Sequence, residues 1–221
     1  MPVQSHSVVP LPVRIEAGGD MLNGDLSLPA DAAGLVLFAH GSGSSRHSPR
    51  NRMVADALQR ARLATLILDL LTESEERVDA ITAEFRFDIP LLADRVRAAV
   101  DWARASQATS SLSIGLFGAS TGAAAALIAA ADRPGIVRAV VSRGGRPDLA
   151  DAALDRVVAP TLLIVGGRDD VVVRLNREAY ARLGSEKHLD LVPGASHLFD
   201  EPGALDEVAR VAREWFQRYL A

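Results

Sequence analysis

Short runs of consecutive apolar residues alternate along the chain with longer stretches in which apolar residues recur every three or four positions. Residues 35–39 form an uninterrupted apolar run, and residues 53–61 carry an apolar stripe at helical spacing. Continuous apolar strands alternating with amphipathic helices are typical of a mainly parallel sheet that is covered on both faces. The other strands predicted in this way are 65–68, 112–117, 137–141, 161–165 and 189–192, and the other helices are 90–105, 121–131, 175–183 and 205–219.

The N-terminal part of this pattern predicts an antiparallel pair at the edge of the sheet. Residues 11–17 and 21–28 are strand candidates, and Gly18, Gly19 and Asp20 between them are typical turn residues. We expect one α/β domain over residues 1–221, with a flexible tail at 1–10. Residues 41–50 and 71–89 show weak periodicity and are expected to be irregular.

Composition excludes several classes of function. The net charge of −4 gives no basic excess for binding nucleic acid, and the absence of Cys excludes disulfides, thiolate metal sites and a Cys nucleophile. The longest purely apolar run is residues 123–131, whereas a membrane span needs about 20 residues. Residues 1–10 do not resemble a signal peptide, so we expect a cytoplasmic protein. The spacing of His40 and His47 supports no metal site, and no cofactor is expected.

The clearest chemical motif is the G-x-S-x-G sequence from Gly118 to Gly122, which follows a predicted strand and precedes a predicted helix. A serine on a sharp strand-to-helix turn needs small neighbours, and this turn exposes its hydroxyl as a nucleophile. Ser120 is therefore the candidate nucleophile. The alternative is that Ser120 only caps the helix that follows.

A serine hydroxyl needs a base, and that base needs an orienting acid. His197 follows the last predicted strand and is the candidate base, because it completes the chain order serine, acid, histidine. The acid should follow the strand 161–165, where Asp169 is our choice and Asp170 the alternative. This order along the chain, with each candidate after a predicted strand, predicts a Ser–His–Asp triad.

Backbone amides should bind the negatively charged oxygen of the reaction intermediate. The expected donors are the amide of Thr121, after the nucleophile, and the amide of Ser42 in the glycine-rich loop after strand 35–39. His40 and Gly41 in the same loop are expected to border the substrate. The loop has no phosphate-binding motif of the G-x-x-x-x-G-K-[ST] type, and no G-x-G-x-x-G motif opens a helix, so a nucleotide site is not expected.

Four of these segments resemble the α/β-hydrolase fold, specifically the dienelactone-hydrolase-like family. They are the His40-Gly41 loop, the Gly118 to Gly122 turn, the Gly167-Arg168-Asp169 turn and the Gly194 to His197 turn. The similarity covers about residues 11–220. Dienelactone hydrolases proper use a Cys nucleophile, so the resemblance implies a serine esterase of that lineage. No large insertion follows strand 137–141, where this fold often carries a lid, so we expect an open site.

The expected substrate is a small carboxylic ester. Arg143 and Arg146 follow the strand 137–141, and one of them is a candidate for pairing with a substrate carboxylate; the alternative is an internal pair with Asp148 or Asp151. Candidates for substrate binding also include three arginines near the glycine-rich loop after strand 35–39, namely Arg46, Arg50 and Arg52. A solvated acidic face is expected from Glu73, Glu75 and Glu76.

Two other functions remain open at this stage. The same triad could serve an acyltransferase or a perhydrolase, and a binding protein could keep the fold without turnover. The sequence also leaves open a homodimer formed through an edge strand or a helix face.

Overall fold

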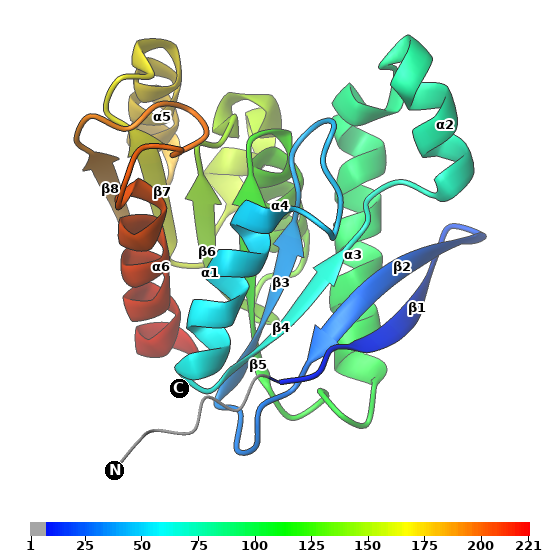
Figure 1. Cartoon of the computed structure of the whole chain (residues 1–221). Helices are drawn as coiled ribbons and strands as arrows, with labels where there is room; N and C mark the ends of the chain where they lie inside the picture. Colours follow the sequence, from blue (N-terminus) through cyan, green and yellow to red (C-terminus); the bar gives the residue numbers. More distant parts are fainter. Residues whose placement is uncertain (1–7) are drawn as a thin grey trace.

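The strands of the described region form one mostly parallel sheet, in the order β1–β2–β4–β3–β5–β6–β7–β8 (Figure 1). The structure is a computed structural model, and it describes residues 8–221. Only β1 and β2 run antiparallel to their neighbours, at the edge predicted from the sequence. The strands are β1 (Leu11–Ala17), β2 (Asp20–Ser27), β3 (Gly34–Ala39), β4 (Leu63–Leu68), β5 (Ser113–Ala119), β6 (Val137–Arg143), β7 (Thr161–Gly166) and β8 (Lys187–Val192).

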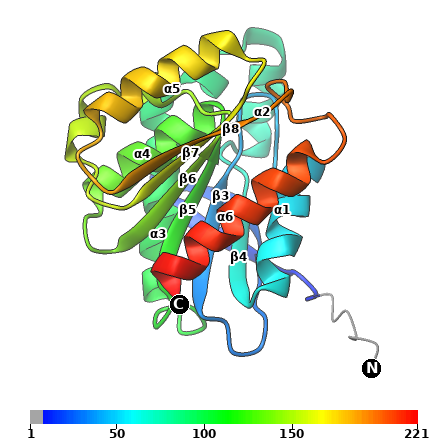
Figure 2. The same ribbon diagram turned by 90° about the vertical axis from the view of Figure 1, so that its left-hand side faces the viewer.

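Helices cover both faces of this sheet, as Figure 2 shows from the side. One face is covered by α1 (Pro49–Arg60) and α6 (Ala204–Leu220). The other is covered by α3 (Ile89–Ala105), α4 (Thr121–Asp132) and α5 (Asp170–Arg182). The remaining helical segments of the described region are α2 (Glu73–Thr82), η1 (Phe85–Phe87) and η2 (Pro147–Arg156). This is the α/β architecture expected from the alternating pattern, and no lid is evident in the described region.

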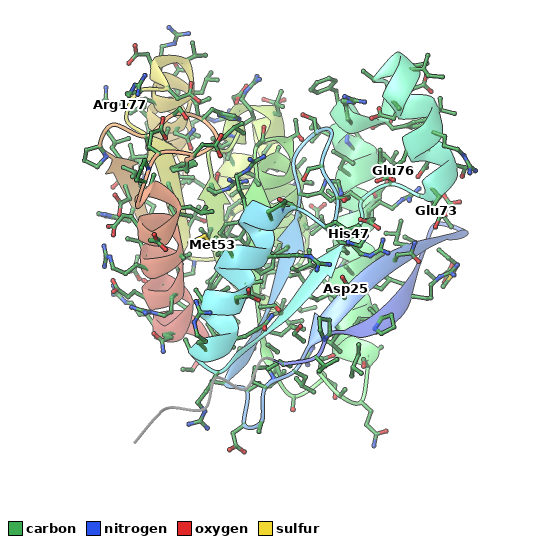
Figure 3. The ribbon with its side chains drawn as sticks, viewed as in Figure 1. Asp25, His47, Met53, Glu73, Glu76 and Arg177 are labelled. Carbon is green, nitrogen blue, oxygen red and sulfur yellow. The ribbon has the colours of Figure 1, made fainter. Side chains whose placement is uncertain are left out.

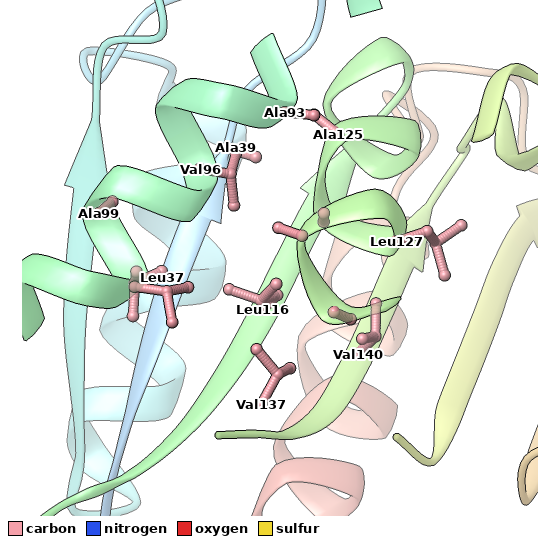
Figure 4. Close-up of a cluster of buried hydrophobic side chains, with 14 of the residues drawn as sticks. Leu37, Ala39, Ala93, Val96, Ala99, Leu116, Ala125, Leu127, Val137 and Val140 are labelled. Carbon is pink, nitrogen blue, oxygen red and sulfur yellow. The ribbon is translucent and has the colours of Figure 1, made fainter. Parts of the chain in front are cut away.

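The core on the α3 and α4 face is built from small and branched side chains (Figure 4). Val96 and Ala99 of α3 and Ala125 of α4 face Leu37 of β3 and Leu116 of β5, and all five are at most 1% exposed. The alanines of α4 let this helix lie close to the sheet. The start of α4 is thereby held firmly against the end of β5, where Ser120 lies.

Two expectations about irregular segments were wrong. The chain forms a helix, α2, inside 71–89, and α1 begins at Pro49 rather than at residue 53. In both cases the helix start rests on capping: Thr72 and Glu75 form a reciprocal capping box, and the Ser48 side chain accepts a hydrogen bond from the Asn51 amide. Capping and ion pairs, not an apolar stripe, define these starts.

The N-terminal hairpin turns at Gly18 and Gly19, both with positive φ, as a two-residue turn between right-twisted strands requires. The expected flexible tail at 1–10 lies largely outside the described residues. Among residues 8–221, no helix combines the length and the apolar character needed to cross a membrane.

Candidate active site

Ser120 lies on a strained turn between β5 and α4. Its φ of 50° and ψ of −120° belong to a region that residues other than glycine rarely adopt. The turn is held by backbone bonds to the end of β6: the Ser120 amide donates to the Arg143 carbonyl (3.2 Å), and the Arg146 amide donates to the Ser120 carbonyl (3.0 Å). Strain held in place in this way indicates a functional constraint on the serine.

The Ser120 side chain does not cap α4, since it makes no capping hydrogen bond. The small neighbours predicted for such a turn are required here. A Cβ atom on Gly118 would lie 2.4 Å from the Ala123 Cα, and one on Gly122 would lie 2.4 Å from the Ala39 and His40 carbonyl oxygens. The alternative role of a simple helix cap therefore finds no support in the geometry.

His197 and Asp169 are brought together by two turns that lie against each other. The His197 Nδ1 atom is 2.7 Å from the Asp169 Oδ2 atom. The other Asp169 oxygen, Oδ1, accepts the Val172 amide at 3.3 Å and so caps α5. The exposed Asp170 makes no such contact with His197. The aspartate at the helix cap is thus the one that orients the histidine.

Two backbone amides are free to act as donors next to Ser120. Within the described region, neither the Thr121 amide nor the Ser42 amide donates a hydrogen bond. The Thr121 amide is also at the N-terminus of α4, where the helix dipole favours a negative charge. Gly41 allows the loop to approach the nucleophile, because a Cβ atom there would lie 2.9 Å from the Ser120 Cβ.

The loop that carries Ser42 is fastened to the sheet by ion pairs. Arg46 binds the Asp69 carboxylate through both its guanidinium and its backbone amide. Arg52 of α1 reaches Asp25 of β2 (2.9 Å) and the His47 ring (3.2 Å). Figure 3 shows His47 and Asp25 next to each other beneath α2. Arg46 and Arg52 therefore have structural partners within the fold.

The Ser120 pocket, a cavity of about 210 Å³, is bordered by both the candidate nucleophile, Ser120, and the candidate base, His197. It lies between the β3–α1 loop, the start of α1, the end of β6 and the His197 turn. Its lining residues are Gly41, Ser42, Ser44, Ser48, Arg50, Asn51, Ala119, Ser120, Arg143, His197 and Leu198.

The α2 pocket is a larger cavity of about 510 Å³ on the other side of the same loop. Leu70, Leu71 and Leu92 give it an apolar part beside polar side chains, and Thr121 also borders it. Glu76 of α2 also borders it (Figure 3), and burial together with the nearby Asp69 charge raises the pKa of Glu76. Sequence reasoning treated Glu76 as part of a solvated face, which is wrong for this residue.

The four expected substrate contacts differ in their surroundings. Arg143 is buried and borders the Ser120 pocket, whereas Arg146 binds Asp148 through two hydrogen bonds of 2.9 and 2.6 Å and borders neither pocket. Gly41 borders both pockets. His40 borders the α2 pocket, but its Nε2 accepts the Leu70 amide (3.0 Å) and its Nδ1 bonds the Gly41 carbonyl (2.9 Å). The geometry therefore favours Arg143 over Arg146 and gives His40 a structural role.

Several residues of the site were not singled out from the sequence. Ser48, Asn51 and Leu198 border the Ser120 pocket, and Asp79 and Arg86 border the α2 pocket. The Ser48-Pro49 start of α1 was the available signal for the first of these. Across residues 8–221, no group of three or more His, Asp or Glu side chains is placed to hold a metal ion.

The fold is that of the α/β-hydrolase class. Residues 53–221 match the model of the dienelactone hydrolase family, and the chain belongs to that family. A solved structure described as a dienelactone hydrolase, from Anabaena variabilis, is 56% identical, superposes with a TM-score of 0.96, and covers 98% of this chain and 100% of its own.

Two further comparisons extend this picture. A structure from Xanthomonas campestris, described as an α/β serine hydrolase without a lid, is 21% identical with a TM-score of 0.77, covers 97% of this chain and 96% of its own, and shows the shared fold. A protein of Mycobacterium tuberculosis, provisionally named a phosphoribosyl transferase, is 55% identical over 208 residues, which is 94% of this chain and 46% of that protein. The chain thus spans less than half the length of this curated relative.

Proposed function

We propose that the chain is a serine esterase that cleaves carboxylic esters through an acyl-enzyme on Ser120. The observation that carries the proposal is the presence of Ser120 and His197 in one pocket, with the histidine bonded to Asp169 at 2.7 Å. The dienelactone hydrolase family supports the hydrolytic class of the reaction.

The first half of the reaction forms the acyl-enzyme. The Ser120 oxygen attacks the ester carbonyl carbon while His197 Nε2 takes the hydroxyl proton, and the Thr121 and Ser42 amides bind the oxyanion. The intermediate collapses by breaking the bond to the alcohol oxygen, which receives the proton from His197. Asp169 holds the histidine with the proton on Nδ1 and stabilises the imidazolium.

The second half returns the enzyme to its starting state. A water molecule gives a proton to His197 as it attacks the acyl carbon, and collapse of the second intermediate releases the acid and restores the Ser120 hydroxyl. If an alcohol or hydrogen peroxide took the place of this water, the same steps would give an acyltransferase or a perhydrolase.

The name of the tuberculosis relative does not support a phosphoribosyl transferase activity for this chain. This chain spans 46% of that protein, so the phosphoribosyl transferase name describes a chain that is more than twice as long. Ser120 and His197 in one pocket support the proposal of hydrolysis instead.

The test is labelling with a fluorophosphonate, which reacts with an activated serine, read by intact mass. We expect one adduct on the wild type and on His188→Ala, whose histidine is exposed on β8, and none on Ser120→Ala or His197→Ala. The rate on 4-nitrophenyl acetate should fall about 10⁴–10⁶-fold in Ser120→Ala. An adduct that persists in folded Ser120→Ala would contradict the proposal, and added hydrogen peroxide or alcohol that outcompetes water would assign the transferase variant.

A further inference from the structure

Arg143 is a buried cation that forms no ion pair within the described residues, although the Asp200 charge lies near enough to act on it. The residue is 8% exposed, and its Nε and Nη1 atoms are buried with no hydrogen-bond partner. None of the ion pairs of the described region includes it. Its guanidinium lies over the Phe199 ring, 5.8 Å from the ring centroid, and this contact holds the group in place.

The pocket that Arg143 borders contains cationic and polar groups and no acid. Arg50, Asn51 and His197 share it with Ser120. Arg50 contacts Asp200 only at 3.4 Å, on a carboxylate that is 60% exposed, and its Nε atom is buried without a partner. Asp200 is thus paired loosely with Arg50 and does not line the pocket.

A buried guanidinium without an anion is costly, because its N–H groups lose water and gain nothing in return. Burial, with a smaller contribution from the charge of Arg50 and against a small opposing effect of the Asp200 charge, lowers the pKa of Arg143 to about 10, so the group remains protonated at neutral pH. A carboxylate or phosphate on a bound molecule would supply the missing acceptor, and a guanidinium is suited to bind either one through two bonds.

The position of His197 decides which part of an ester carries that anion. His197 must protonate the departing oxygen, so the alcohol part of the ester leaves on the side of the histidine. His197 and Arg143 border the same pocket of about 210 Å³. The α2 pocket of about 510 Å³, which Thr121 also borders and which combines leucine side chains with polar ones, is the remaining space for the acyl part.

We propose that the Ser120 pocket binds esters whose alcohol part carries an anionic group, a carboxylate or a phosphate, and that Arg143 is the residue that binds it. The inference rests on the proposed esterase function and adds the substrate class. It makes Arg143, and not the paired Arg146, the residue that determines specificity.

The experiment compares aryl acetates that differ in one group of the leaving phenol. The anionic substrates are 4-acetoxybenzoate and 4-acetoxyphenyl phosphate, and the neutral match is 4-acetoxybenzamide. A fourth ester, the succinate monoester of 4-hydroxybenzamide, carries its anion on the acyl side. We expect kcat/KM to be at least about tenfold higher for an ester with an anionic leaving phenol than for 4-acetoxybenzamide, which corresponds to the free energy of one charge-assisted hydrogen bond. The anionic ester with the higher kcat/KM identifies the preferred anion as carboxylate or phosphate.

The variants then assign this preference to one side chain. Arg143→Met should lower kcat/KM for the preferred anionic ester about 10–100-fold more than it lowers kcat/KM for 4-acetoxybenzamide. Arg143→Lys should recover part of the preference, because it restores the charge without the planar pair of donors. The matched control is Arg146→Met, which removes an arginine of the next loop that already has a partner, Asp148, and should keep the full preference.

The outcomes separate this inference from the function on which it rests. Three results would each overturn the inference and leave the esterase function standing. They are Ser120-dependent hydrolysis of 4-acetoxybenzamide without a preference for anionic esters, an equal loss of kcat/KM on all esters in Arg143→Met, and a preference for the succinate ester. Absence of hydrolysis of all four esters would contradict the esterase itself.

Direct binding gives a readout that needs neither turnover nor a folded Arg143→Met variant. We expect 4-hydroxybenzoate or 4-hydroxyphenyl phosphate, titrated into the wild type, to bind more tightly than 4-hydroxybenzamide and to slow fluorophosphonate labelling of Ser120. Equal binding of the anionic and neutral phenols to the wild type would overturn the inference.

Discussion

At the scale of single residues, Asp169 serves two purposes with its two carboxylate oxygens. One oxygen caps α5 through the Val172 amide, and the other lies 2.7 Å from His197 Nδ1. The sequence narrowed the acid to two neighbours, because a strand end can be recognised from the apolar pattern. It favoured Asp169 and left Asp170 as the alternative, since the choice depends on which of the two caps the helix that follows.

The double role of Asp169 leads to a prediction about its amide variant. Asp169→Asn keeps the shape of the side chain but removes the charge that holds the proton on Nδ1, so kcat should fall about 10³–10⁴-fold. Esterase kinetics measure this effect, with thermal unfolding as a check on the fold. Asp170→Asn, on an exposed carboxylate, is the control and should keep the wild-type rate. A comparable loss in both variants would mean that the acid has been misassigned.

At the scale of elements, the strands and the long helices follow from the apolar pattern, and α2 does not. The stripe of α2 is weak: Val78 and Ile81 are 43% and 88% exposed. Its stability comes from the capping box of Thr72 with Glu75 and from the ion pair of Glu75 with Arg95. The capping box was readable in the sequence, but the ion pair joins groups 20 positions apart and requires the fold.

The turn between β5 and α4 yields a prediction at this scale. Gly118→Ala should lower the free energy of unfolding by about 1–3 kcal/mol, because the new methyl group would collide with backbone atoms of α4 that cannot move aside. It should also reduce activity by displacing Ser120. Gly184→Ala is the matched control: nothing lies within 4 Å of its added Cβ, so it should be neutral or stabilise by about 0.4–1 kcal/mol. Urea unfolding compares the two, and equal stability of both variants would refute the steric argument.

At the scale of the whole molecule, the sheet order brings together loops that are far apart in the sequence. The segments around residues 41, 120, 143 and 197 border one pocket. The prediction that these loops lie at the carboxyl-terminal edge of the sheet requires only that the strands before them are parallel. Predicting that Arg143 lacks a partner while Arg146 has one requires the side chains in place, and the sequence offered both arginines equally.

The stability of the whole fold should depend on pH through His40. Burial lowers the pKa of His40 below its usual value of 6.5, against smaller opposing effects of the Gly41 carbonyl and the Asp69 charge. The unfolded chain then binds more protons than the folded one below about pH 6.5, so the free energy of unfolding falls as the pH falls through that range.

The measurement is urea unfolding of the wild type, His40→Gln and His188→Gln at pH 7.5 and 5.5. We expect the loss of stability on acidification to be smaller in His40→Gln than in the wild type, because the variant has no group to protonate at this position. His188→Gln, at an exposed position, should behave like the wild type. Identical losses in all three proteins would show that His40 does not contribute.

The β3–α1 loop separates two cavities and carries one of the amides proposed to bind the oxyanion, so it is a shared wall. A substitution that shifts its backbone changes both cavities and the donor at once, whereas α2 borders only one cavity and the start of α1 only the other. Under the proposed division of the substrate between the two cavities, selection or design could alter the preference for one half of a substrate without disturbing the other, provided that the loop itself is left intact. The two halves of specificity would then evolve independently.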